Sequence, residues 1–548
     1  MQLDLILENL NGLTMDPSRP RVEAIGILGN RIVAAGAAHE LADLRATTRL
    51  DLGGATVVPG FNDAHNHMSF FGATLNEVDL TPAAVGSVEE VVEAIAAKAD
   101  RSTPGTWVVG SRYDHNKLAE RRHPTRHELD RVSPDNPVLL QHTSGHFSVV
   151  NTAAMRLARI GEVDIPEGGV IPLGADGTPT GLLEEQAQKL AKDLLHPFSE
   201  ADLVQNLGAA SDHYLSEGIT SAQEAAVGGL LGSAEPLEVA AYQRARAEGR
   251  LRIRVSMMVA VENLHGALHH PDDPEPFTLD LGLHTSFGDD FLRVGPTKIF
   301  ADGSLMGRTA AMFDDYAGEP GNNGYFQMEE DLLHSLILRA HRSGWQIATH
   351  AIGDRAVASV LDAYAEALRL HPRDDHRHRI EHCGVIRDTD VDRMAELGVI
   401  PVPQARFISE IGDGMAAALG PERVPTCYRQ RSFLDAGLIV PGSSDRPVVA
   451  GAPMLGVHDL VNQRTASGAP FNPHEALTVD EALYAYTMGS AIASFDEDVK
   501  GSITAGKLAD LAVLDRDPTA IAPDTIADTQ VLATMVGGRV EYDAVGLA

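Results

Sequence analysis

Cysteine is scarce in this sequence, with Cys383 and Cys427 as the two examples among 548 residues. Two distant cysteines exclude a disulfide framework and a cysteine-based zinc site. Long apolar runs are also missing, since none approaches the roughly 18–20 residues that span a membrane. The opening MQLDLILENLNG lacks the basic segment and the small-residue cleavage site of a signal peptide. We therefore expect a cytoplasmic protein with no membrane partner.

Positive charge is in short supply as well. The chain has 44 Lys and Arg against 77 Asp and Glu, which gives a formal net charge of −33. Nucleic acids are polyanions, so this balance argues against nucleic acid as a partner. We expect a small-molecule substrate, whose identity the net charge does not reveal. The assembly state stays open, with a homodimer as one option.

Strand and helix signals divide the chain into β-rich ends and an α/β middle. Residues 1–58 and 495–548 carry short alternating strands separated by Gly and Asn turns, which predicts one small β-sandwich built from both termini. Residues 59–494 show eight strand signals with helices between the later ones, which is typical of an α/β fold of the (β/α)8 or TIM barrel type. Residues 70–215 fit no single strand–helix step, and we interpret them as a lobe inserted after barrel strand 1, over the barrel mouth.

Two histidines one residue apart follow the first barrel strand. The segment TVVPGFNDAHNH passes from apolar to polar, and strand alternation places His65 and His67 on one side, in line with Asp63. Neutral imidazole is a good ligand for zinc and similar ions. A bare pair of this kind is more often two solvent-exposed loop histidines, so the rest of the chain must decide.

Further polar residues stand at the ends of later barrel strands. They are Lys298, Asp302, His350, His382 and Asp445. Active sites of such barrels lie at the C-terminal strand ends, so these side chains should meet the two histidines. Singly, each has a structural alternative, such as a buried ion pair for the lysine or an Asx turn for the last aspartate. Together they indicate a metal centre.

The neighbouring residues carry a family resemblance. The words PGFNDAHNH, KIFADGSL, THAIGD, HRIEHC, GSSDRPV and GSITAGKLADLAVLD, in this order, resemble the YtcJ-like branch of the amidohydrolase superfamily. The resemblance covers essentially the whole chain, including the ends and the insertion. That branch is similar to N-substituted formamide deformylases, and the superfamily mostly hydrolyses amide, ester or other C–N bonds.

The resemblance implies a metal centre with defined roles. The histidine pair after strand 1 would hold a more buried ion, and Lys298, carboxylated by CO2, would bridge two zinc ions. His350 and His382 would hold the second ion. Asp445 would bind the first ion and act as general base and acid while a metal-bound hydroxide attacks the amide of a small molecule. One ion held without the lysine remains the alternative, and iron, manganese or nickel would also fit.

The scissile bond stays open. Deformylation of an N-substituted formamide is the expectation that the resemblance favours. A deaminase, or a hydrolase of cyclic amides or esters, would use the same metal centre. A non-catalytic barrel scaffold is a remote alternative, because every expected ligand is present in the sequence.

Two segments are predicted to form substrate walls. Residues 302–326 are a Gly-rich loop too long for a plain connector, and they offer Phe313 and Tyr316 to an apolar group. Asp302 lies in phase with Lys298, and it would orient the site or cap this loop. In residues 141–155, His146 and Asn151 stand where the YtcJ-like pattern has a His and an Asn, and we expect them near the substrate.

Overall fold

The computed structural model describes residues 2–142, 147–166, 168–174, 176–229, 235 and 237–547. Contacts within the chain divide it into two compact units. The first unit joins both ends of the chain to the α/β middle, and the second spans Ser69–Ala209. None of the helices in the described part combines the length and the apolar character that a membrane span needs.

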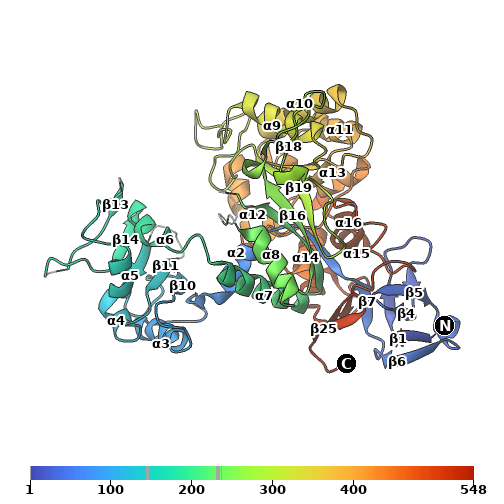
Figure 1. Cartoon of the computed structure of the whole chain (residues 1–548), viewed down its shortest axis with the longest axis horizontal. Coiled ribbons are helices and arrows are strands. Elements are labelled where there is room, and N and C mark those ends of the chain that lie inside the picture. Colours follow the sequence, from blue (N-terminus) through green and yellow to red (C-terminus); the bar gives the residue numbers. More distant parts are fainter. Residues whose placement is uncertain are drawn as a thin grey trace. The chain divides into compact units, whose positions relative to one another are not determined.

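The first unit is built on a parallel sheet that nearly closes into a barrel, which confirms the predicted α/β barrel class (Figure 1). Within the described residues the sheet has seven strands in the order β8-β15-β16-β19-β20-β21-β22. Almost all residues of these strands are buried, as expected when helices cover a parallel sheet. The strands are β8 (Phe61–Asn66), β15 (Ile219–Val227), β16 (Arg254–Ala260), β19 (Leu292–Phe300), β20 (Ile347–Ala351), β21 (Arg379–His382) and β22 (Ile400–Val402).

The predicted eighth strand, residues 438–445, differs from the other seven. It runs beside β8 without a regular ladder, and Pro441 has no N–H to contribute to one. Single hydrogen bonds join it to β8 instead: Ala64 N–H donates to the Gly442 carbonyl (2.9 Å), and Asp445 N–H donates to the His65 carbonyl (2.7 Å). An irregular segment therefore fills the eighth position and ends at Asp445.

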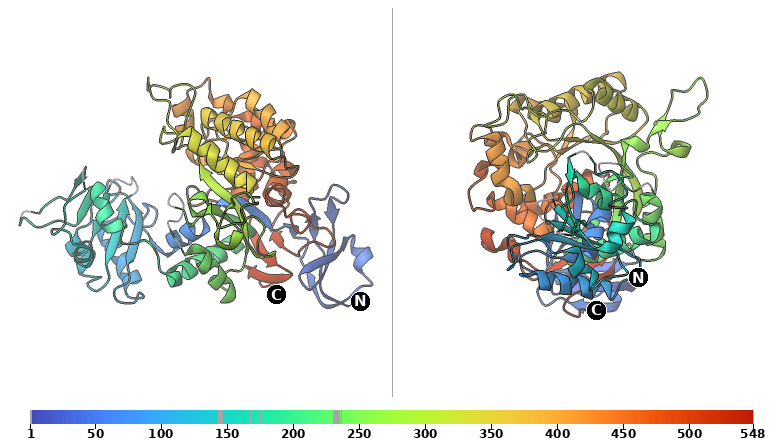
Figure 2. Two further views of the ribbon diagram at one scale, coloured as in Figure 1. Left: turned by 45° about the horizontal axis from the view of Figure 1, so that its top comes forward. Right: turned by 90° about the vertical axis from the view of Figure 1, so that its left-hand side faces the viewer.

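Helices between the strands bury one apolar face each. In α10, Val357, Val360, Leu361 and Tyr364 repeat at helical spacing and are fully buried. Figure 2 shows α9, α10 and α11, in yellow to gold, side by side. Helix α7 (Glu200–Ser216) crosses the boundary between the units. The α-helices that follow it along the chain are α8 (Glu238–Ala247), α9 (Glu330–Arg342), α10 (Asp354–Leu370), α11 (Asp388–Leu397), α12 (Arg406–Leu419), α13 (Gln430–Asp435), α14 (Pro453–Asn462), α15 (Val479–Tyr484) and α16 (Ser490–Ile492).

The two ends of the chain meet in two further sheets. One sheet contains β1 (Gln2–Glu8), β4 (Ala24–Leu28), β5 (Arg31–Gly36) and β6 (Arg45–Asp51). The other combines β2 (Asn11–Leu13), β3 (Arg21–Val22) and β7 (Thr56–Pro59) with β23 (Leu511–Leu514), β24 (Val531–Val536) and β25 (Arg539–Asp543). Leu7 and Ile27 of the first sheet share a buried apolar cluster with Val57 and Val513 of the second.

Gly60 is the point where the terminal sheet passes into the barrel. Its N–H donates to the Asp510 carbonyl (2.9 Å), while the next N–H, from Phe61, donates to the Gly218 carbonyl (3.0 Å). A Cβ on residue 60 would lie 2.2 Å from Thr220 Oγ1, so no larger residue fits here without a shift. The start of β8 is therefore hydrogen-bonded to the residues just before β23 on one side and just before β15 on the other.

The second unit has its own six-stranded sheet, in the order β13-β14-β12-β11-β10-β9. Val91, Val92 and Ile95 of α3 pack with Val108 and Leu140 of the sheet in a separate buried cluster. The strands are β9 (Val78–Asp79), β10 (Val108–Tyr113), β11 (Val138–His142), β12 (Phe147–Val150), β13 (Gly169–Val170) and β14 (Leu182–Glu185). The helices are α2 (Met68–Asn76), which begins at the boundary between the units, α3 (Val88–Ala99), α4 (Arg126–Asp130), α5 (Thr152–Leu157) and α6 (Lys189–Lys192).

A buried ion pair between β16 and the C-terminal segment generates a stability prediction. The Arg254 guanidinium donates to both carboxylate oxygens of Asp510, at 2.6 and 3.0 Å, and both side chains are less than a tenth exposed. Asp510→Ala leaves the buried guanidinium without its partner, so we expect the free energy of unfolding to fall by about 3–5 kcal/mol. Glu8→Ala removes an ion pair with Arg49 whose side chains are 36% and 35% exposed, and it should cost less than about 1 kcal/mol. Urea unfolding measures both, and equal losses would contradict the prediction.

Candidate active site

His65 and His67 extend from the C-terminal end of β8, as strand alternation predicts. The His65 side chain is almost fully buried, and that of His67 is 16% exposed. Asp63, in the same phase, does not join them at the site: it accepts the backbone N–H groups of His65 (3.2 Å) and Ser444 (3.0 Å). Burial raises the pKa of Asp63 to about 6. Asp63 therefore ties β8 to the segment that carries Asp445.

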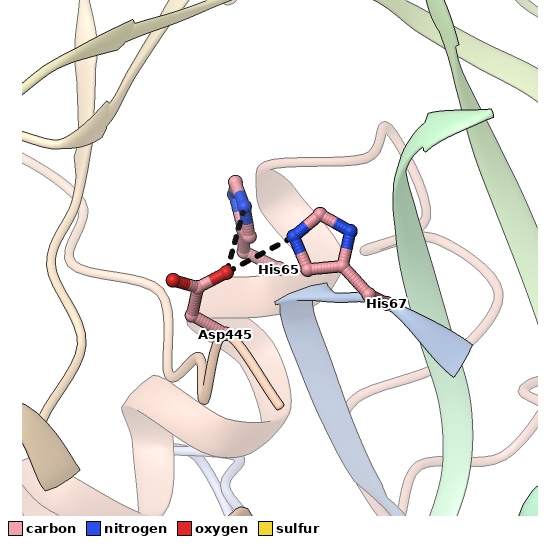
Figure 3. A group of neighbouring side chains, drawn as sticks. All are labelled: His65, His67 and Asp445. Atoms are coloured by element: carbon pink, nitrogen blue, oxygen red, sulfur yellow. Dashed lines mark ion pairs between the residues drawn. The ribbon is translucent and has the colours of Figure 1, made fainter. Parts of the chain in front are cut away.

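Asp445 faces both histidines (Figure 3). Its Oδ1 lies 3.2 Å from His67 Nε2 and 3.5 Å from His65 Nε2. The residue has a φ of 60°, in the left-handed region that Asp tolerates better than most residues. This conformation, with its N–H bonded to the His65 carbonyl, turns the carboxylate toward the two rings.

The other nitrogen of each ring is held by an acceptor. His67 Nδ1 donates to the Ala225 carbonyl (3.1 Å), and His65 Nδ1 contacts the Glu381 carboxylate. Burial lowers the pKa of His65 well below its usual value, so the ring is neutral. A neutral ring with its proton on Nδ1 has only a lone pair on Nε2. The Nε2 atoms of the two rings and one carboxylate oxygen thus lie close together, an arrangement that could hold a metal ion.

Glu381 was not singled out from the sequence, and its role is clear in the structure. Arg379 donates to both of its oxygens (2.7 and 2.9 Å) and also to the Ala64 carbonyl (2.7 Å). Strand alternation separates Glu381 from His382, but a φ of 67° at His382 turns the chain there. The available signal was a pair of charged residues, Arg379 and Glu381, two positions apart in a short strand that is otherwise flanked by buried elements of the barrel.

His382 and His350 lie next to this group. Their ring centroids are 4.5 Å apart, and the His382 ring is 5.0 Å from that of His65. Gln404, which was also not singled out from the sequence, accepts from His382 Nδ1 (2.7 Å). The other ring nitrogen of His382, Nε2, is thereby left as the atom that could bind a metal. His350 Nε2 instead faces the Gly303 carbonyl (3.0 Å). Burial lowers the pKa of His350 to about 3, so this ring is neutral as well.

Lys298 reaches the same place from β19. Its Nζ lies 3.4 Å from His65 Nε2 and 4.9 Å from the centre of the Phe300 ring. The side chain is buried, and burial lowers the pKa of the amine to about 8. A larger share of this lysine is therefore uncharged near neutral pH than of an exposed lysine.

Asp302 is buried and binds backbone. Its oxygens accept the N–H groups of Ala311 (2.9 Å), Ile352 (3.0 Å) and Gly353 (2.8 Å). Burial raises its pKa to about 7, while these three donors act in the opposite direction. The residue joins the long loop after β19 to the end of β20, and its Oδ1 also lies 3.5 Å from His350 Nε2, so whether it orients the site or caps the loop stays a prediction.

The predicted wall residues differ in how they are placed. Tyr316 is buried and donates to the Ala310 carbonyl (2.9 Å), whereas Phe313 is 45% exposed and stacks with the Arg387 guanidinium. Asn151 caps α5 by accepting from Ala154 N–H (2.9 Å), and its amide donates to two carbonyls of the second unit. His146 lies outside the described residues. Contact of these residues with a substrate stays a prediction.

Comparison with known proteins agrees with this geometry. The amidohydrolase family model matches residues 49–542. The chain is 34% identical to an N-substituted formamide deformylase of Arthrobacter pascens, over 99% of both chains, and 30% identical to a putative amidohydrolase YtcJ of Bacillus subtilis, over 97% of this chain and 98% of that one. The crystal structure of an uncharacterized metal-dependent hydrolase from Pyrococcus furiosus superposes with a TM-score of 0.75 at 29% identity, covering 94% of this chain and 99% of that one.

The family model spans most of the chain, and the two relatives align with almost the whole length of this chain. The strand-end histidines and carboxylate that the sequence singled out lie together at one end of the barrel. This chain therefore belongs to the amidohydrolase family, in its YtcJ-like branch, and is a metal-dependent hydrolase of C–N bonds.

Proposed function

We propose that the chain removes the formyl group from a small N-substituted formamide, at a divalent metal centre held by His65, His67 and Asp445. The observation that carries the metal assignment is that His65 Nε2 and His67 Nε2 both lie close to one carboxylate oxygen of Asp445, while the other nitrogen of each ring faces an acceptor. The choice of formamide rests on the deformylase relative, which matches this chain over 99% of its length.

The donor set fits a zinc-like ion. Ligand atoms about 2.0–2.1 Å from a tetrahedral zinc lie about 3.3 Å from one another. The separations of Asp445 Oδ1 from the two Nε2 atoms, 3.2 and 3.5 Å, are close to this value. All three donor atoms lie within 4.8 Å of one another. When bound, a divalent ion supplies Lewis acidity, which makes water nucleophilic at neutral pH and polarises a carbonyl oxygen.

Asp445 is the proposed proton carrier. Oδ1 faces the histidines and the second carboxylate oxygen is turned away from the two rings (Figure 3), and this second oxygen would take a proton from the attacking water. The same carboxyl then gives this proton to the amine nitrogen, so that the leaving group departs as a neutral amine rather than an amide anion. Its left-handed backbone fixes the carboxylate in this place.

Lys298 is the proposed bridge to a second ion. Carboxylation joins the uncharged amine to CO2 and releases one proton, and the carbamate formed carries the negative charge that a metal ligand needs. With a pKa of about 8, roughly half of the amine is uncharged at pH 8, whereas less than about 1% of an ordinary lysine is uncharged at that pH. His382 Nε2 and His350 are the proposed remaining ligands of that ion, and the His350 ring would have to leave the Gly303 carbonyl if it binds through Nε2.

A substrate comparison tests the proposal directly. We expect the zinc-loaded chain to release formate from N-substituted formamides faster than it cleaves acetamides, cyclic amides or esters, or deaminates amines. Asp445→Asn should keep most of the metal and lose about 10²–10⁴ in kcat, because the proton carrier is gone. Formate release and metal content measure both effects. Preference for a cyclic amide, an ester or a deamination would overturn the formamide assignment, and near-normal kcat in the variant would overturn the role of Asp445.

The contact between Glu381 and His65 generates a second prediction. In Glu381→Gln an amide NH2 replaces one acceptor, and it must face either Arg379 or the His65 ring, which are both donors. We expect zinc affinity to fall by about 10–100-fold, because the His65 ring loses the acceptor that holds it in the orientation for binding the ion. Competition with a chromophoric chelator measures this affinity. Glu396→Gln, at an exposed position of α11, is the matched control and should bind zinc like the unmutated chain; a tight-binding Glu381 variant would contradict the role.

The two-ion form makes a third prediction. After chelation, reloading with zinc at pH 8 should restore one more equivalent per chain with bicarbonate than in CO2-free buffer. Lys298→Met should remove this difference, because a methionine cannot be carboxylated. Metal analysis and the mass of the intact peptide containing residue 298 report the result. Equal metal content with and without bicarbonate in the unmutated chain would leave the one-ion centre as the correct form.

A further inference from the structure

A second group of metal-ligand side chains belongs to the second unit and shares no residue with the group assigned to catalysis. Asp114 and His115 directly follow β10, and His142 is the last residue of β11. β10 and β11 are parallel neighbours, and their register sets Tyr113 opposite His142. The three side chains are therefore brought together by strand pairing and not by a chance meeting of loops. We propose that Asp114, His115 and His142 form a second site for a zinc-like divalent ion.

The distances within this triad suit one ion. His115 Nδ1 lies 3.0 Å from His142 Nε2, and Asp114 Oδ1 lies 3.6 Å from the same His142 nitrogen. These values lie on either side of the separation of about 3.3 Å expected between ligands of a tetrahedral zinc. One donor atom of each residue lies within 4.8 Å of the other two. Two imidazoles and one carboxylate are also a donor set that zinc prefers.

Neighbouring rings hold the histidines in place. His123 stacks on His115 with a centroid distance of 4.1 Å and an interplanar angle of 24°. The buried Tyr113 hydroxyl in turn bonds His123 Nδ1 at 2.9 Å. Phe147 packs edge-on to His142 at 5.5 Å. Ordered rings lose little conformational freedom when an ion binds, so the site is prepared for binding.

The triad is also accessible enough to be loaded. The Asp114 side chain is 20% exposed, while that of His142 is 5% exposed. One side of the site therefore faces solvent, which leaves room for water as a fourth ligand. The ion would link the ends of two neighbouring strands and so stabilise the second unit. Without an ion, the same geometry is a hydrogen bond between His115 and His142, and this is the alternative that an experiment must separate.

Metal counting by difference tests the site independently of the catalytic centre. The full chain reloaded with zinc should hold one equivalent more than His115→Ala/His142→Ala, whatever the catalytic centre binds. His127→Ala, an exposed histidine in α4 of the same unit, is the matched control and should hold as much zinc as the unmutated chain. Equal zinc in the double variant and the control would overturn the proposal.

A second measurement needs no variant and does not depend on how the double variant folds. Crystals of the full chain grown with zinc should show an anomalous difference peak at the zinc edge between Asp114, His115 and His142. Absence of that peak, with the catalytic centre occupied, would overturn the proposal and leave the hydrogen bond as the role of the triad. A catalytic centre that fails to bind zinc would instead contradict the proposed function alone.

Discussion

The buried contact between Arg379, Glu381 and His65 is the interaction on which the catalytic end of the barrel depends. One guanidinium satisfies both oxygens of Glu381 and the Ala64 carbonyl, so it links β21 to β8. Glu381 then holds one nitrogen of His65, which leaves the other directed at Asp445. A buried carboxylate between a guanidinium and an imidazole is stable only with all partners present, so the ring orientation is set by charge and not by packing alone.

Two further residues proposed for the metal centre are positioned by backbone conformation. Asp445 and His382 both have positive φ values and stand where strand geometry ends. Each would point elsewhere if its strand continued for another residue. Strain of this kind persists where surrounding contacts enforce it, and here the contacts are the hydrogen bonds to the His65 carbonyl and to Gln404. The barrel thus supplies rigid strand ends, and local departures from regular geometry aim the side chains.

Much of this arrangement could be predicted from the sequence, because strand alternation and the C-terminal end rule act locally. They predicted the barrel, and they singled out His65, His67 and Asp445, which lie together in the structure. Glu381 could not be found in this way, since alternation places it away from His382 and only the turn at that residue brings both inward. Asn151 is the reverse case, a residue that the sequence pattern suggested for substrate contact. In the structure its amide caps a helix and donates to two backbone carbonyls. Its contact with a substrate cannot be judged from sequence pattern alone.

The passage at Gly60 has a consequence for how the chain folds during synthesis. β7 and β8 form one stretch of chain interrupted by this single residue, and β7 pairs with β23 near the C-terminus. Until Leu511–Leu514 leaves the ribosome, one edge of β7 has no partner, and exposed strand edges invite wrong pairing. The stretch that leads into β8 is thus paired along this edge by residues that are made long after it. The order of translation therefore delays completion of the sheet that leads into β8 until β23 has been made.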